Sequence, residues 1–420
     1  MSLNTTKKSQ IQANMGNEAA LIKRMVMELA DTPPQLTVDN YREIFVRLTA
    51  KDVLRCGTVC KAWRSITTDP DFLAYHARCQ QTEVLLYKYL YREFPSNEHC
   101  IVDIVLDALL VSGDEARQHR LIRYPNQTRD WLLIASSHGV LLFGKGEGLY
   151  LLCNPLTRKW ADLPRLPQAQ RRGMIDNKEY AFYFHKPSHE YRLLCCRNWW
   201  SANGTWCVLS TGETQPRYID TPHAEAAGIT RLVPGLRMTV TTPVSLHGRL
   251  HWPPYQGALS DHTSMVVFDM TSETFSQMQG PPTTTGSLVK LFDMDGLLVG
   301  ADFGKENHID LWFPESYGTA ARWELRHQVA IPWGHYNAGR ILKPIDLLSV
   351  AAAGDSNGNV MLGNRYGLVV YNVKRRETVK TINTLVTDDF VVSRHMFRAN
   401  LVQHPHFAMR PSADLPYVHF

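Results

Sequence analysis

The chain has 420 residues, of which 44% are hydrophobic and 20% are charged, and its formal net charge is +5 at pH 7. This composition is typical of a globular protein with one large core or two ordinary ones, and it excludes general disorder. No block of five or more like charges occurs, so the basic balance does not predict direct binding to nucleic acid.

The eight cysteines show no spacing typical of a metal site, and no apolar secretory segment opens the chain. We therefore expect a reducing environment, in the cytoplasm or the nucleus. We also expect no membrane association, no metal and no cofactor.

The first 35 residues predict a tail that is polar at its start and helical from about residue 17 to residue 30. Leu21, Met25 and Leu29 fall on one side of that helix, and Pro33 and Pro34 end it. Such an apolar side either packs on the module that follows or mediates self-association.

Residues 36–78 show helical periodicity, which predicts three short helices near 39–48, 50–57 and 59–67. The apolar residues that recur at spacings of three and four are Ile44, Phe45, Leu48, Val53, Leu54, Val59, Cys60, Trp63 and Ile66. Asp39 and Asp69 precede helical stretches and are expected to serve as N-caps.

The run Val59, Cys60, Lys61, Trp63, Arg64 and Ser65, followed by Asp69, Pro70 and Phe72, resembles the F-box, the helical module that docks onto a Skp1-type adaptor. The family usually begins with Leu-Pro, where this chain has Leu36 and Thr37. Three short helices are too few to enclose a core, so the partner is expected to complete it. The resemblance implies an adaptor-facing and internal apolar surface formed by Leu36, Ile44, Leu48, Leu54, Val59, Cys60 and Trp63. For each of them, contact with the adaptor and a purely internal role both remain open.

From residue 81 onward, short apolar runs alternate with turn residues, which predicts a strand-rich domain. Four strands are expected between 132 and 164, and similar units recur at a period of about 45 to 57 residues, as blades of a β-propeller do. The five units span 129–164, 179–220, 238–280, 286–331 and 345–383.

The ends of the strand-rich region are expected to share one blade. Three strands at 83–124 remain unassigned, and a strand near 390–403 can complete them, closing a ring of six blades without a free edge. A ring of seven blades remains an alternative if the two ends form separate blades. The predicted fold is thus an α+β multidomain protein with a three-helix F-box at 36–78 and an all-β propeller at 83–403. Residues 1–35 and 404–420 are the tails.

The segment CNPLTRKWADLP at 153–164 resembles the F-box-associated and kelch-like repeats of plant F-box proteins. Asn154 and Pro155 are predicted to set a turn, and Trp160 to pack on the next strand. Together with the F-box resemblance, this implies a plant-type F-box protein with a C-terminal kelch-like propeller.

No catalytic residue is expected, since the chain has neither a G-x-S-x-G elbow nor a phosphate-binding glycine loop. Five histidines are interpreted as solvated loop residues and not as metal ligands: His185, His189, His247, His251 and His262. Target recognition is assigned to loops at one end of the propeller, because loops on rigid scaffolds carry recognition and Trp and Arg dominate binding hot spots. The candidate target-binding residues are Trp199, Trp200, Tyr255, Trp333 and Arg340.

The resemblance implies a substrate receptor of an SCF-type ubiquitin ligase. Its F-box would bind Skp1, and through it a cullin, while the propeller would hold a target protein. A non-degradative F-box adaptor or transcriptional cofactor is the alternative. A propeller enzyme ranks third, because it would need a metal site or paired carboxylates.

Overall fold

The computed structural model describes residues 36–93, 99–112, 115–125, 131–145, 148–166, 177–197, 205–219, 242–254, 264–282, 289–305, 307–318, 321–331, 351–364, 367–383 and 391–409. The chain divides into two compact units, residues 1–72 and residues 73–420. The helices are α2 (Val38–Phe45), α3 (Ala50–Cys56), α4 (Lys61–Thr67) and α5 (Pro70–Cys79). The three expected helices are present, and α5 is a fourth that follows them.

Local capping chemistry explains where these helices begin. Thr37 Oγ1 accepts a hydrogen bond from Asn40 N at 3.3 Å, and Asn40 Oδ1 accepts one from Thr37 N at 3.0 Å. This reciprocal pair is a capping box, so Thr37 and not Asp39 caps α2. The expectation for Asp39 was wrong because that residue lies inside the helix.

The role predicted for Asp69 is confirmed at the start of α5. Its Oδ1 accepts a hydrogen bond from Asp71 N at 3.4 Å. Pro70 occupies the first helical position, where the missing N–H costs nothing. The extra helix thus has a start signal that the three-helix prediction left out.

An aromatic group joins α2 to α4 in the first unit. The ring centroid of Trp63 lies 5.5 Å from that of Tyr41 and 5.0 Å from that of Phe45. Phe45, Val53 and Ile66 are buried, whereas Trp63 is half-buried. Edge-to-face contacts of this kind stabilise a small core beyond the area that they bury.

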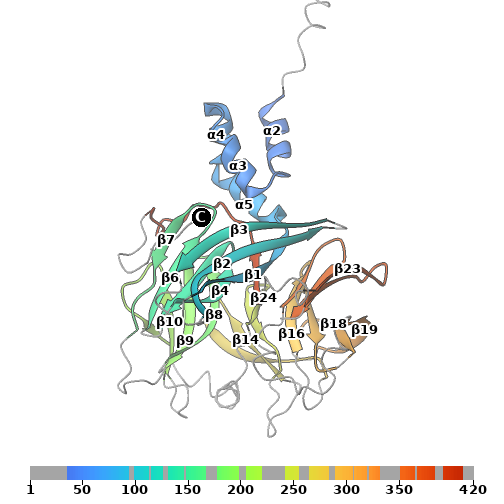
Figure 1. Ribbon diagram of the computed structural model, residues 1–420. Coiled ribbons are helices and arrows are strands. Elements are labelled where there is room, and N and C mark those ends of the chain that lie inside the picture. The colour runs from blue at the N-terminus through green and yellow to red at the C-terminus, as the bar shows by residue number, and fades with distance from the viewer. Residues whose placement is uncertain are drawn as a thin grey trace, which may run out of the picture. The chain divides into compact units, whose positions relative to one another are not determined.

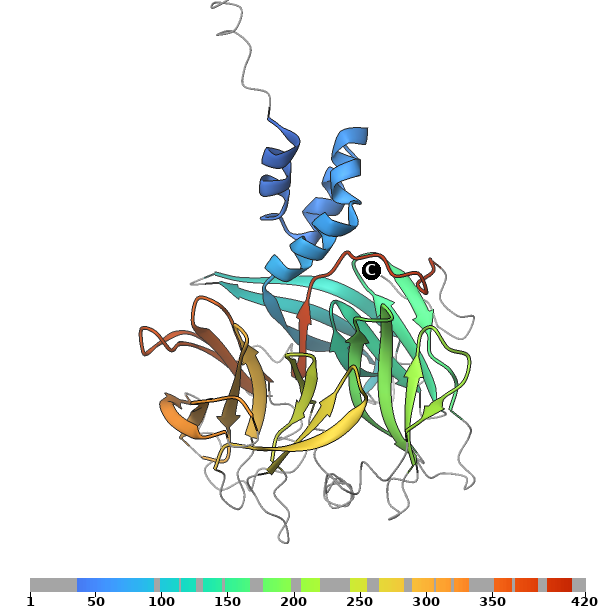
Figure 2. The same ribbon diagram turned by 180° about the vertical axis from the view of Figure 1, so that it is seen from behind.

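The second unit is a propeller of six four-stranded antiparallel sheets (Figures 1 and 2). The first two sheets along the chain contain β4 (Trp131–Ser137), β5 (Val140–Lys145), β6 (Leu149–Asn154) and β7 (Lys159–Asp162), then β8 (Asn177–His185), β9 (Glu190–Arg197), β10 (Thr205–Ser210) and β11 (Arg217–Tyr218). The third contains β12 (Val244–Leu246), β13 (Arg249–Trp252), β14 (Ser264–Asp269) and β15 (Thr274–Gln279). The next two contain β16 (Val289–Met294), β17 (Leu297–Asp302), β18 (His308–Pro314) and β19 (Trp323–Ala330), then β20 (Ala351–Gly354), β21 (Asn359–Asn364), β22 (Gly367–Asn372) and β23 (Glu377–Asn383). Each corresponds to one of the five predicted units.

The sixth sheet joins the two ends of the strand-rich region, as predicted. Its order is β24 (Val391–Arg398), β1 (Thr82–Glu93), β2 (His99–Ser112) and β3 (Glu115–Pro125). The antiparallel register places Thr82 opposite Arg398 and Tyr87 opposite Val391. The ring therefore has six blades and not seven, and β24 covers the inner edge of β1.

Residues 399–409 bind the blade formed by β4–β7. The backbones of Trp160 and Ala408 exchange two hydrogen bonds of 2.8 Å. Asn400 Nδ2 donates to His138 O at 2.9 Å, and Asn154 Nδ2 donates to Asn400 O at 2.9 Å. We call residues 399–409 the terminal latch, since they tie the closing strand to the neighbouring blade.

Asn154 also sets the predicted turn after β6, where its Oδ1 accepts hydrogen bonds from Leu156 N at 3.1 Å and Thr157 N at 3.2 Å. A side chain that bonds its own downstream backbone is the usual reason for Asn in such turns. Trp160 is buried on β7.

Neighbouring blades bury one another through shared apolar clusters. One cluster joins Tyr183 and Trp206 to Phe268 of the next blade. A partly buried ion network crosses the same boundary, because Glu273 Oε1 accepts hydrogen bonds from Arg192 Nη1 at 2.7 Å and Arg217 Nη2 at 2.8 Å. Burial alone would raise the pKa of Glu273, but the two guanidinium groups lower it. The carboxylate therefore stays charged and paired between blades.

Two properties of the described residues bear on function. None of their helices combines the length and the apolar character needed to cross a membrane. Nor does this part of the chain hold a group of three or more His, Cys, Asp or Glu side chains placed to bind a metal ion.

Candidate protein-docking surface

The first unit exposes large aliphatic side chains that its own small core does not cover. Val59 is 64% exposed, Val38 58% and Leu36 49%. Ile44 and Leu54 are exposed as well. We call these five residues the aliphatic surface. Exposed groups of large apolar side chains mark sites of protein interaction in soluble proteins.

Each of these side chains sits on an element with a defined position. Val38 and Ile44 belong to α2, Leu54 belongs to α3, and Val59 lies in the turn between α3 and α4. The unit also fixes this turn with side-chain bonds, because Arg64 Nε donates to Gly57 O at 3.0 Å and Thr58 Oγ1 donates to Arg55 O at 2.7 Å. Val59 is therefore presented by an ordered turn.

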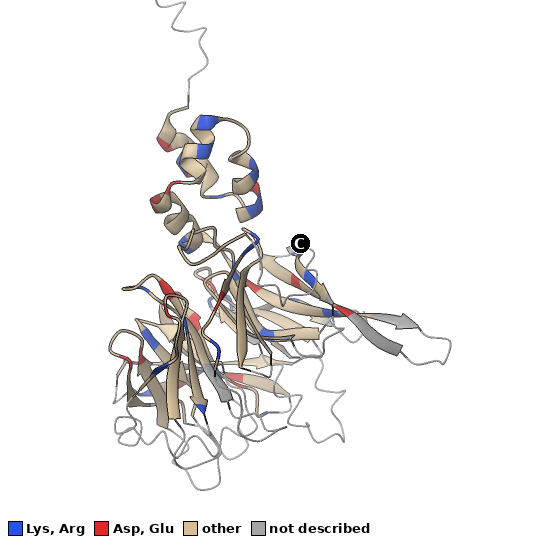
Figure 3. Ribbon diagram, turned by 90° about the vertical axis from the view of Figure 1, so that its left-hand side faces the viewer, with Lys and Arg blue, Asp and Glu red and all other residues tan. Residues whose placement is uncertain are grey.

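An ion pair also fixes the position of α2 within this unit. Arg42 Nη2 lies 2.6 Å from Asp69 Oδ2, which joins α2 to the start of α5. The Thr49 hydroxyl donates to Asp52 at 2.7 Å, and this bond lowers the pKa of the Asp52 carboxyl. The helices of this unit carry basic and acidic residues, although α4 carries only the basic Lys61 and Arg64 (Figure 3). The distinctive property of this unit is thus its exposed aliphatic character and not a charge of one sign.

The structure separates the seven residues predicted for adaptor binding into two groups. Leu36, Ile44, Leu54, Val59 and Cys60 are exposed. Leu48 and Trp63 are half-buried, and Trp63 packs inside the aromatic group. Cys60 also caps α4, since its Sγ accepts a hydrogen bond from Trp63 N at 3.4 Å. The first five residues are therefore accessible to a partner, the other two are partly covered, and their role in adaptor binding stays a prediction.

Sequence reasoning missed Val38 on this surface. Val38 is the first residue of α2 and directly follows the Thr37 cap. The apolar periodicity at spacings of three and four starts at Ile44, six positions later, and does not include Val38. An apolar residue next to an N-cap was the available signal.

The candidate target-binding residues Trp199, Trp200, Tyr255, Trp333 and Arg340 lie outside the described residues, and so does His262. They therefore stay a prediction.

The interpretation of the remaining histidines needs a correction. His189 and His247 are exposed, but His185 and His251 are buried. His251 Nδ1 lies 3.3 Å from Val244 O, and its Nε2 lies 2.6 Å from the hydroxyl of Tyr317. Burial lowers the pKa of His251 to about 4. These two residues are neutral structural groups on strands and not solvated loop residues.

Comparison with known families agrees with this division of the chain. The family described as "F-box associated beta propeller domain" matches residues 112–390, and the family described as "F-box-like" matches residues 42–80. The second match coincides with the helical unit that carries most of the aliphatic surface.

Two curated relatives come from Arabidopsis thaliana. F-box protein At3g07870 is 21% identical over 406 residues, covering 86% of this chain and 92% of the relative. Putative F-box protein At1g47730 is 23% identical over 322 residues, covering 72% of this chain and 74% of the relative. Among solved structures, a nidogen/laminin complex covers 76% of this chain and 100% of that chain, at 9% identity and a TM-score of 0.41.

Proposed function

Because the chain belongs to the F-box associated beta propeller family, we propose that it is the substrate-recognition subunit of an SCF-type ubiquitin ligase. In this proposal the helical unit docks a Skp1-type adaptor, which connects it to a cullin, and the propeller holds a target protein. The chain itself performs no chemistry. It would act in the cytoplasm or the nucleus.

The observation that carries the proposal is the aliphatic surface. Burying one such side chain completely contributes about 1.5–3 kcal/mol relative to leaving it exposed. The five side chains are each about half exposed, so covering them with a partner would contribute several kcal/mol before the costs of association. An F-box-like match over the same helices makes a Skp1-type adaptor the expected partner.

Substitution of exposed residues tests the docking. Val59→Asp or Leu54→Asp places a charge on the aliphatic surface, where both side chains are exposed. Since hot-spot changes cost about 2 kcal/mol or more, we expect affinity for a purified Skp1-type adaptor, measured by titration calorimetry, to fall at least about 30-fold. Leu132→Asp is the matched control, because Leu132 is 63% exposed on the propeller strand β4. A folded Val59→Asp protein that binds as tightly as wild type would contradict the proposal.

Target capture is assigned to the propeller loops that carry Trp199, Trp200, Tyr255, Trp333 and Arg340. The support is their residue types, since Trp, Tyr and Arg are the usual anchors of protein interfaces. Alanine at each of these positions should abolish capture of the target while adaptor binding stays intact. Capture at wild-type efficiency by all of the single variants would place recognition elsewhere.

The non-degradative alternative is separated by target lifetime. In cells that carry the Val59→Asp protein, a target that is degraded through the ligase should become long-lived. An unchanged half-life, with target binding retained, would favour an adaptor or cofactor role.

A further inference from the structure

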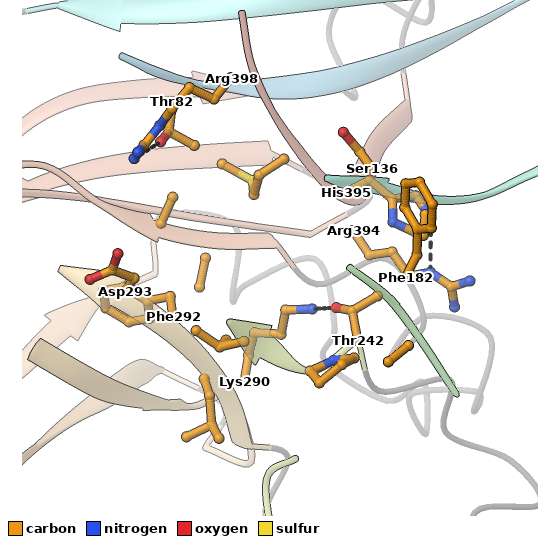
Figure 4. Close-up of a pocket in the computed structure, with 18 of the residues that line it drawn as sticks. Thr82, Ser136, Phe182, Thr242, Lys290, Phe292, Asp293, Arg394, His395 and Arg398 are labelled. Atoms are coloured by element: carbon orange, nitrogen blue, oxygen red, sulfur yellow. Dashed lines mark hydrogen bonds between the residues drawn. The ribbon is translucent and has the colours of Figure 1, made fainter. Parts of the chain in front are cut away.

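The inner strands of the six blades surround a central cavity of about 220 Å³ (Figure 4). Residues of β4, β8, β12, β16, β20 and β24 line it, so every blade contributes. Twelve of the twenty described lining residues are apolar, including Ile134, Phe182, Leu193, Phe292 and Met396. The volume is below the roughly 300–1,000 Å³ of ordinary ligand pockets, so any occupant is small.

A lysine projects into this cavity with few protein partners. Lys290 extends from β16 toward Thr242, and its ammonium donates a hydrogen bond to the Thr242 hydroxyl (Figure 4). An ammonium has three N–H donors. Among the described residues, the Thr242 hydroxyl is the one hydrogen-bond acceptor for the Lys290 ammonium. Burial, together with the nearby charge of Arg394, lowers the pKa of Lys290 to about 7.

A second cation is held at a fixed orientation beside the same space. Arg394 Nε donates to His395 Nε2 at 3.2 Å, and His395 also bonds the backbone of Leu133. Since an arginine can only donate, His395 accepts at Nε2 and is neutral. Burial also keeps the pKa of His395 well below its usual value. His395 is thus a positioning residue for the guanidinium of Arg394.

The remaining polar groups complete an environment for an anion. The hydroxyl oxygen of Ser136 is buried and has no hydrogen-bond partner among the described residues. Arg398, also in the lining, donates to Thr82 at 3.0 Å. Asp293 is the one carboxylate among the lining residues that the structure describes, and it accepts a hydrogen bond from Gly296 N at 2.8 Å. Cations therefore outnumber anions around the cavity.

We propose that the central cavity binds a small organic carboxylate, whose charged group is held by Lys290 and Arg394 and whose apolar body lies among the aliphatic and aromatic lining. A singly charged group suits this cavity better than a phosphate, because desolvation of a dianion among apolar side chains costs far more. The lining offers both a charged end and an apolar remainder, and a small carboxylic acid has both. This inference stands independently of the adaptor and the ligase.

The wild-type protein provides the first test. Benzoate and benzamide have nearly the same shape, but only benzoate carries a charge. We expect the full chain to bind benzoate, measured by saturation-transfer NMR and calorimetry, and to bind benzamide at least tenfold more weakly. Absence of benzoate binding, or equal affinity for both probes, would overturn the proposal.

Substitution tests whether the site is this cavity. Lys290→Met keeps the length of the side chain, removes the ammonium, and should weaken benzoate binding at least tenfold. Lys186→Met is the control, since Lys186 is exposed in the turn after β8 and should leave the affinity unchanged. Ser136→Ala provides a milder second variant at the unpartnered hydroxyl, with an expected severalfold loss. Wild-type affinity in both cavity variants would contradict the assignment.

The carboxylate can belong to a free acid or to an acidic side chain of a bound protein. A blocked Ala-Glu-Ala tripeptide and its Ala-Gln-Ala counterpart distinguish these sources by competition with benzoate. Displacement by the glutamate peptide alone supports a protein side chain. Benzoate binding that neither peptide displaces supports a free acid.

Discussion

At the scale of single residues, two glycines share a backbone conformation but have different surroundings. Gly139 has φ 76° in the turn between β4 and β5, and Gly248 has φ 75° in the turn between β12 and β13. A Cβ on Gly139 would lie 2.8 Å from Asn400 N and 2.9 Å from Arg398 O, both backbone atoms. A Cβ on Gly248 would meet no atom within 4 Å.

This pair separates backbone strain from steric overlap. Gly248→Ala should lower the free energy of unfolding by about 1–2 kcal/mol, which is the cost of a left-handed conformation for a residue with a Cβ. Gly139→Ala should cost clearly more, because the terminal latch at Asn400 must also shift. Urea unfolding of the two variants measures the difference. Equal losses of unfolding free energy in the two variants would show that the terminal latch shifts without an energetic cost.

Predictions for single residues succeeded where the deciding partner is local in sequence. Asn154 and Asp69 bond backbone groups two or three residues away, so their roles could be predicted. Asp39 was misassigned because Thr37, two positions earlier, competes for the same cap. The burial of His251 could not be predicted, since its partner Tyr317 is 66 positions away.

At the scale of elements, the closing strand and the terminal latch make separable contributions. A chain ending at residue 390 lacks β24 and exposes the edge of β1, so we expect it to aggregate and to lose cooperative unfolding. Thermal melting followed by circular dichroism, together with sedimentation, measures both properties. A soluble 1–390 chain with one sharp transition would show that closure is dispensable.

A chain ending at residue 398 keeps β24 and removes only the latch. It loses six hydrogen bonds to the rest of the chain: two between Trp160 and Ala408, two at Asn400, one between Lys159 and Gln403 and one between Tyr191 and His404. At about 0.5–1.5 kcal/mol each, these bonds contribute about 3–9 kcal/mol, and we expect one cooperative transition to be retained. Melting at the wild-type temperature would contradict a stabilising role for residues 399–409.

The five internal blades could be predicted because each repeats the same alternation of short apolar runs and turn residues. The shared blade also could be predicted, because three strands at one end of the region and one strand at the other make up a four-stranded sheet. The register in which these strands pair could not be predicted. The bulges in β1 near Val84 and Leu90 depend on partners in β24 and β2 and leave no local trace in the sequence.

At the scale of the whole molecule, buried histidines predict a loss of stability in mild acid. Burial lowers the pKa of His251 and His404 to about 4 and that of His395 well below its usual value. The unfolded chain takes up protons at these sites below pH 6.5, whereas the folded chain does not. Stability from these groups is therefore present above pH 6.5 and is lost as the pH falls toward 4.

One carboxyl group acts in the opposite direction. Burial raises the pKa of Glu83 to about 7, so its contribution favours the folded chain at low pH and is lost between pH 4.5 and 7. Three histidines outweigh one glutamate, and we expect the urea midpoint to be clearly lower at pH 5 than at pH 7. His251→Gln should reduce that difference. Equal midpoints at both pH values would contradict the assigned burial.

The central cavity could not be predicted from the sequence. Thr242, Lys290 and Arg394 come from three different parts of the chain and form no motif, because only ring closure brings the inner strands together.

Because its last strand closes the ring, the propeller can become complete only late in synthesis on the ribosome. Synthesis proceeds at roughly 5–20 residues per second, so β1 at Thr82 waits about 15–60 s for β24 at Val391. The aliphatic surface emerges long before then. Under the proposed function, a transcript with a stop codon before Val391 yields a product that occupies the adaptor and presents no finished propeller. We expect such alleles to act dominantly, by competing with intact copies, and not as simple losses.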